Sequence, residues 1–205
     1  MNIIAFTGPI GSGKTVAGEI LKRRGYKIFS LTDEILVEIE RVHPGEEVTR
    51  TLKQDIGDKG RLEHGNDYWA KLAADKVATS ISEGTSNIII DSIYNPLEID
   101  YLKKRFPGIV VIGFDADFER REHRVSMRRK DGDPICDEAE LASVLRRDLG
   151  IRQPDNGQQV IRCLKKANIL IDNNMDDPRE LERQLDEKLA GAGIEGLRRN
   201  PREIR

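Results

Sequence analysis

At 205 residues, the chain is long enough for one domain with a single sizeable hydrophobic core. Hydrophobic residues make up 38% and charged residues 34%, a balance typical of a globular protein in water. The formal net charge of −2 gives no overall basic field that would attract a nucleic acid polymer. No apolar run approaches the roughly 20 residues that span a bilayer, so we expect no membrane association.

Two further features bear on the compartment. The first 15 residues contain no basic leader followed by an apolar stretch, so we expect no signal peptide. Cys136 and Cys163 lie far apart and match no metal-ligand spacing. Reduced thiols of this kind favour a cytoplasmic protein, and the sequence leaves open whether it is a monomer or a homodimer.

Five short runs rich in Ile and Val are predicted to be strands. They do not alternate with polar residues, as expected for strands that are covered on both faces. The runs span residues 2–6, 27–31, 87–91, 109–114 and 168–172. Because stretches with helical spacing lie between them, we predict a parallel sheet with right-handed crossovers, and hence a three-layer α/β/α domain.

The lengths of the connections indicate how the domain is organised. The segment 32–86 is too long for one crossover helix, so we predict several inserted helices there. A second helical and loop excursion, about 117–166, separates the fourth and fifth strands. We assign residues 1–190 to a single domain. Residues 191–205 carry four arginines and few core-forming side chains, which predicts a flexible tail.

A glycine-rich loop follows the first strand. Gly8, Gly13, Lys14 and Thr15 match G-x-x-x-x-G-K-[ST] at every fixed position. Glycines let the backbone wrap so that its N–H groups cradle phosphates, and the following helix offers its positive N-terminus to the same anion. Lys14 is expected to reach the β- and γ-phosphates, and the Thr15 hydroxyl to hold Mg²⁺. The expected ATP contacts along this stretch are Gly8, Ile10, Gly11, Ser12, Gly13, Lys14, Thr15 and Val16.

Two aspartates end predicted strands. Asp91 closes the third strand, where a neighbouring parallel strand would bring it beside the loop, so we predict that it joins Thr15 in holding magnesium. Asp33 follows the second strand and could face the acceptor as a general base. Either residue could instead cap a turn.

Basic residues cluster in the second excursion, and Arg121, Arg124 and Arg128 share one helical face. A charge run is usually a solvated face. In a protein with a phosphate-binding loop, however, the segment 117–136 is a natural lid whose arginines would neutralise the phosphoryl group. We assign Arg124 and Arg128 to catalysis and Arg121 to ATP. Arg50 and Arg61, in the insertion, are candidates for the acceptor's phosphate, although a surface role is also open for each.

Taken together, the chain resembles the nucleoside monophosphate kinase branch of the P-loop kinases and the related dephospho-CoA kinases. Besides the loop, the similarity lies in FSLTDEIL (29–36), TRTLKQDIGDKGRLEHG (49–65), IIIDSIYNPLEIDYLKK (88–104), ERREHRVSMRRKDGD (119–133) and KKANILIDNN (165–174). The resemblance implies a five-stranded parallel sheet in the order 2-3-1-4-5 with ATP on the loop. It also implies an acceptor between the insertion and the lid, and Asn173 near the adenine.

The chain departs from these relatives at the acceptor side. They have arginine where this chain has Tyr94 and glycine where it has Ser92, so Tyr94 stands at an acceptor-binding position. Dephospho-CoA kinases carry two aspartates after the second strand, and here only Asp33 is present. A hydroxyl acceptor benefits from a carboxylate base, whereas a phosphate acceptor needs only charge neutralisation.

We therefore expect an ATP- and Mg²⁺-dependent phosphotransferase that acts on a small phosphorylated acceptor, foremost a nucleoside or deoxynucleoside monophosphate. The first alternative is a dephospho-CoA kinase, with a hydroxyl acceptor. The second is a nucleotide-binding NTPase or switch that acts through a protein partner.

Overall fold

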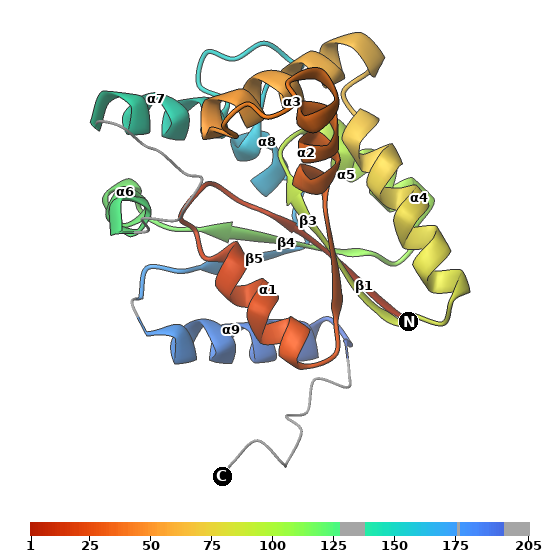
Figure 1. Cartoon of the computed structure of the whole chain (residues 1–205). Coiled ribbons are helices and arrows are strands. Elements are labelled where there is room, and N and C mark those ends of the chain that lie inside the picture. The colour runs from red at the N-terminus through yellow and green to blue at the C-terminus, as the bar shows by residue number, and fades with distance from the viewer. Residues whose placement is uncertain (128–137, 176, 195–205) are drawn as a thin grey trace.

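The computed structural model describes residues 1–127, 138–175 and 177–194, which form three layers around a central sheet (Figure 1). The sheet has five strands in the order β2-β3-β1-β4-β5, and every neighbouring pair is parallel. The strands are β1 (Asn2–Thr7), β2 (Lys27–Ser30), β3 (Asn87–Ile93), β4 (Val110–Asp115) and β5 (Ile169–Asp172). The predicted fold class and strand order are confirmed.

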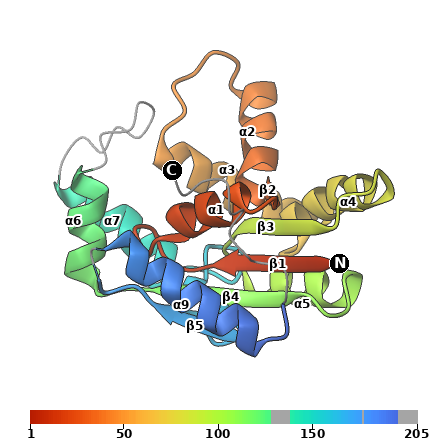
Figure 2. The same ribbon diagram turned by 90° about the horizontal axis from the view of Figure 1, so that it is seen from below.

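Alternate side chains of β1 enter two apolar clusters, one on each face of the sheet. Ile4 and Phe6 pack with helices α1 (Lys14–Arg23) and α9 (Pro178–Gly191). Ile3 and Ala5 pack with the helices of the opposite face, among them α5 (Pro96–Arg105). Figure 2 shows α9 lying across β4 and β5. Burial on both faces explains why β1 is a continuous apolar run in the sequence.

The segment between β2 and β3 contains α2 (Leu31–Val42), α3 (Arg50–His64) and α4 (Tyr68–Ser82). Ser30 caps α2, because its hydroxyl accepts a hydrogen bond from Thr32 N at 3.2 Å. Trp69 joins α4 to α3, donating from Nε1 to the Gly57 carbonyl at 2.8 Å. Helices therefore occupy the predicted insertion.

The segment between β4 and β5 contains α6 (Phe118–Met127), α7 (Glu138–Leu149) and α8 (Val160–Leu164). The part of the predicted lid at 128–136, with Arg128, lies outside the described residues. That α6 belongs to a closing lid stays a prediction.

The described chain continues beyond α9. Ile194 is 7% exposed and joins the apolar cluster of α1 and α9. Ala192 and Gly193 are exposed, so of the predicted tail only Ile194 is packed among the described residues, and 195–205 lie outside them. Among the helices described, none is long and apolar enough to cross a bilayer.

Candidate functional site

The glycine loop joins β1 to α1 in a conformation that only glycine adopts readily. Gly8, Gly11 and Gly13 have φ values of 144°, 81° and 105°. A Cβ atom on Gly8 would lie 2.2 Å from the Phe114 carbonyl oxygen, and one on Gly13 would lie 2.2 Å from Asn173 Nδ2. The loop therefore needs glycine at these positions for space as well as for backbone angle.

Lys14, the first residue of α1, folds back over the loop. Its ammonium donates hydrogen bonds to the carbonyl oxygens of Gly8 and, at 3.0 Å, Pro9. Burial lowers the pKa of Lys14, and the carboxylates of Asp148 and Asp91 act against that shift. The lysine thus lies beside the loop with two carboxylates within electrostatic range.

A cavity of about 120 Å³ opens at the loop and gathers residues from distant parts of the sequence. Loop residues 10–15 line it, together with Arg50 of α3, Asp91 and Ser92 of β3, and Tyr94. The structure therefore brings together Lys14, Thr15, Arg50, Asp91 and Tyr94, five of the residues singled out from the sequence.

Asp91 lies where β3 neighbours β2, in register with Ser30. Burial raises the pKa of Asp91, and the charge of Lys14 opposes the shift. Its Oδ1 atom is buried and has no hydrogen-bond partner among the described residues. A buried carboxylate oxygen without a donor, in a cavity that Thr15 also lines, fits the oxygen ligands that Mg²⁺ takes.

The chain after Asp91 takes an unusual turn. Ser92 has a φ of 65°, in the left-handed region, and its hydroxyl accepts a hydrogen bond from Ser30 Oγ at 3.0 Å. Glycine adopts this backbone conformation more readily than serine does. Tyr94 follows in the cavity wall, and burial raises the pKa of its phenol to about 12. Asp33, exposed in the first turn of α2, does not line the cavity but lies within electrostatic range of Asp91.

The two candidate acceptor arginines have different surroundings. Arg50 lines the cavity. Arg61 is 2% exposed, and its guanidinium bonds to Glu98 Oε1 at 2.8 Å and Asp58 Oδ1 at 3.2 Å. Arg61 therefore joins α3 to α5 inside the protein, and it is not part of the site described here.

Two arginines of α6, Arg121 and Arg124, lie against the loop. Arg121 is 4% exposed, and its backbone carbonyl oxygen would lie 2.8 Å from a Cβ atom on Gly11. Arg124 donates to the carbonyl oxygens of Gly11 at 3.3 Å and Met175 at 2.7 Å. Asn173, after β5, donates from Nδ2 to the Ser12 carbonyl at 2.9 Å. Helix α6 of the predicted lid and the residues that follow β5 thus both contact the loop.

Asp148, near the end of α7, is a site residue that the sequence reasoning missed. It is fully buried, and its Oδ2 accepts a hydrogen bond from Ile10 N at 2.7 Å. The helix buries Leu141, Val144 and Leu145 on one face, and Asp148 continues that stripe. A single carboxylate on an apolar helical face was the signal that could have identified it.

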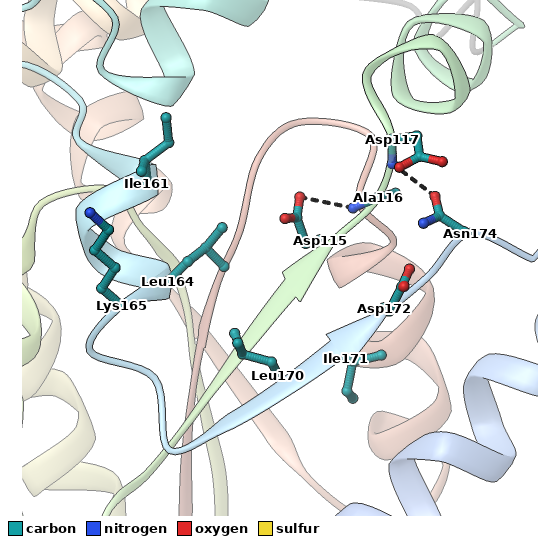
Figure 3. A pocket seen from close by; sticks show the side chains of 10 residues that line it. All are labelled: Asp115, Ala116, Asp117, Ile161, Leu164, Lys165, Leu170, Ile171, Asp172 and Asn174. Carbon is teal, nitrogen blue, oxygen red and sulfur yellow. Dashed lines mark hydrogen bonds between the residues drawn. The ribbon is translucent and has the colours of Figure 1, made fainter.

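Besides this cavity, the described residues also line two grooves. One, of about 520 Å³, starts at Thr15 and Val16 and runs between α1 and α9 to Pro178. The other, of about 510 Å³, lies between α8 and the carboxyl ends of β4 and β5, with apolar residues such as Leu164 and Leu170 beside the carboxylates of Asp115 and Asp172 (Figure 3). This second groove shares no lining residue with the loop cavity.

No family model matches the chain. Among solved structures, the fold is similar to a sugar kinase from Janibacter sp. HTCC2649, with a TM-score of 0.56, 20% identity and 96% coverage of both chains. It is also similar to shikimate kinase from Bacteroides thetaiotaomicron, with a TM-score of 0.55 and 14% identity over 94% of this chain and 98% of that chain. At such identities the likeness shows the fold, which is that of the P-loop kinases.

Sequence relatives give a more specific result. A UPF0200 protein of Pyrobaculum aerophilum is 29% identical over 186 residues, which cover 90% of this chain and 95% of that protein. A UPF0200 protein of Thermococcus gammatolerans is 30% identical over 134 residues, or 64% of this chain and 69% of the relative. With this similarity added to the P-loop kinase fold, the chain belongs to the UPF0200 family.

Proposed function

We propose that this protein is an ATP- and Mg²⁺-dependent phosphotransferase that acts on a small acceptor molecule. The observation that carries the proposal is the shared cavity: the loop with Lys14 and Thr15, Asp91 from β3 and Arg50 from α3 all line it. Few functions other than handling a phosphate chain require this combination of loop amides, lysine, hydroxyl and carboxylate.

The donor triphosphate would lie on the loop. Lys14 would move from the Gly8 and Pro9 carbonyls to the phosphates, and the amides at the start of α1 would bind the same anion. Thr15 and Asp91 would hold Mg²⁺, which when bound neutralises charge on the phosphates. The groove that starts at Thr15 and Val16 combines apolar side chains, such as Ile20 and Pro178, with charged ones, and its volume of about 520 Å³ leaves room for a nucleoside.

Two acceptor classes remain. A nucleoside monophosphate would use Arg50 to neutralise its phosphate. A hydroxyl acceptor, as in dephospho-CoA kinase, gains support from the burial of Arg61, which removes one predicted phosphate ligand from the site. The carboxylate of Asp33, close to Asp91, would then serve as the base that a hydroxyl requires.

The test is to incubate the protein with ATP, Mg²⁺ and a panel of acceptors, and to identify products by mass. The panel holds ribo- and deoxynucleoside monophosphates and dephospho-CoA. We expect one class to gain a phosphoryl group, and Lys14→Ala to lower the rate by roughly 10³-fold or more because charge stabilisation is lost. Lys22→Ala is the matched control, since Lys22 lies exposed on the same helix. ATP hydrolysis without any phosphorylated acceptor would instead support an NTPase or switch.

A further inference from the structure

The buried carboxylate of Asp148 is not accounted for by the phosphotransfer scheme. Asp148 comes from α7, which is distant in sequence from the loop, yet its Oδ2 accepts the Ile10 N–H at 2.7 Å. Its Oδ1 is also buried and has no hydrogen-bond partner among the described residues. A carboxylate that is 0% exposed and only half satisfied is costly unless positive charge lies nearby.

That positive charge belongs to the phosphate site. Burial raises the pKa of Asp148, and the nearby charges of Lys14, Arg50 and Arg121 oppose that shift. The hydrogen-bond acceptors of the Lys14 ammonium are the uncharged carbonyls of Gly8 and Pro9. Burial lowers the pKa of the half-buried Lys14, and the charges of Asp148 and Asp91 oppose that shift.

The position of Asp148 is fixed independently of the loop. The preceding residue, Arg147, forms ion pairs with Asp55 and Asp58 of α3. Gln54 of the same helix donates to the Val144 carbonyl of α7 at 3.3 Å. Because α7 is fastened to α3, its carboxylate is held rigidly against the loop.

We propose that Asp148 is a positioning residue that substitutes for phosphate, serving as the counter-charge of Lys14 while the loop carries no nucleotide. This inference rests on the proposed function, because it takes the loop to be the phosphate site. A bound phosphate would neutralise Lys14 itself, so the carboxylate would then repel the ligand. Asp148 would therefore stabilise the nucleotide-free protein and weaken nucleotide binding, which favours release of ADP.

The test compares Asp148→Asn with the unmodified protein, using Mg·ADP as the probe. Asparagine keeps an oxygen for Ile10 N–H but removes the charge. We expect the melting temperature without ligand to fall by about 4 °C or more, because Lys14 loses a counter-charge. We expect ADP to bind about tenfold more tightly, so that saturating ADP raises the melting temperature by about 3–5 °C more than in the unmodified protein.

Asp186→Asn is the matched control. Asp186 pairs with Arg24 between α9 and α1, and neither residue lines the loop cavity. This variant should lose stability and keep the ADP affinity of the unmodified protein. A merely structural role for Asp148 would give the same pattern in Asp148→Asn, and that result would overturn the inference.

A second variant covers the case in which Asp148→Asn does not fold. If the cost comes from an uncompensated lysine, Lys14→Met combined with Asp148→Asn should melt higher than Asp148→Asn alone. A double variant that is no more stable than the single one would contradict the inference. If the unmodified protein itself fails to bind ADP, the proposed function is wrong, whereas normal ADP binding with no gain in Asp148→Asn rejects only the role of Asp148.

Discussion

At the scale of single residues, Asn173 leaves no room for a side chain at Gly13 in the loop. Asn173 Nδ2 bonds to the Ser12 carbonyl and fills the space that a side chain on residue 13 would need. We expect Gly13→Ala to lower the free energy of unfolding by at least about 2 kcal/mol, through backbone strain and this clash, and to weaken ATP binding.

The control for this prediction is Gly84→Ala. Gly84 also has a positive φ, of 98°, but no atom lies within 4 Å of its would-be Cβ. It should lose only about 1 kcal/mol, measured by urea denaturation, and keep ATP binding. Equal losses at the two positions would show that the contact with Asn173 is unimportant.

Substitutions of the two arginines of α3 should have different effects, one on stability and the other on activity. Arg61 and Glu98 have side chains that are 1% and 0% exposed, so Arg61→Met leaves a buried carboxylate without its ion pair. We expect this variant to lose about 3 kcal/mol of stability and to retain kcat/KM at a temperature where it stays folded.

Arg50→Met should behave in the opposite way, because Arg50 lines the cavity. We expect kcat/KM to fall by about 10- to 100-fold, with the free energy of unfolding changed by less than about 1 kcal/mol. Steady-state kinetics and denaturation on both variants provide the comparison. A large fall in kcat/KM in Arg61→Met would contradict this prediction and indicate that Arg61 binds the acceptor.

At the scale of helices and strands, α3 and α4 pack closely enough to exclude a methyl group. A Cβ on Gly60 would lie 2.3 Å from Trp69 Cζ2, whereas one on Gly18 of α1 would meet only Ile28 Cδ1, at 3.4 Å. Both glycines lie inside helices, where alanine is intrinsically favoured by about 1 kcal/mol. Calorimetry should therefore find Gly18→Ala neutral to stabilising and Gly60→Ala destabilising by about 1–3 kcal/mol. If the two substitutions changed the stability in the same direction, the result would contradict this difference in packing.

The elements were easier to predict than the contacts between them. The strands and the loop follow from local patterns: apolar runs such as residues 87–91, and glycines at fixed spacing before Lys14. The location of Arg61 does not, because a charged residue inside a helix gives no sign of the carboxylate that will meet it from another helix. Asp148 likewise accepts its hydrogen bond from Ile10, which is distant in sequence. The sequence shows only that a carboxylate interrupts an apolar helical face.

At the scale of the whole molecule, buried acids make the fold sensitive to alkali. Burial raises the pKa of Tyr94 from 10.0 to about 12 and moves the pKa of the Cys163 thiol well above its ordinary 9.0. Because the folded state holds these protons more tightly than the unfolded state, their contribution is complete below about pH 9 and is lost as the pH rises toward 12.

Each such group can lower the free energy of unfolding by at most about 1.4 kcal/mol per pH unit in this window. Denaturation curves between pH 8 and 11 should show this decline, and Cys163→Ala should make it shallower. An unchanged slope in Cys163→Ala would mean that the thiol titrates alike in the folded and unfolded states.

The central claim concerns the molecule as a phosphotransferase whose donor lies on the loop. The most direct measurement supplies ATP labelled with ³²P at either the γ- or the α-phosphorus, with Mg²⁺ and the acceptor identified from the panel. We predict that label reaches the acceptor from γ-labelled ATP alone, that chelation of Mg²⁺ stops the transfer, and that Lys14→Ala slows it by roughly 10³-fold or more. Label that appears only as inorganic phosphate, or an undiminished rate of transfer in Lys14→Ala, would contradict the account.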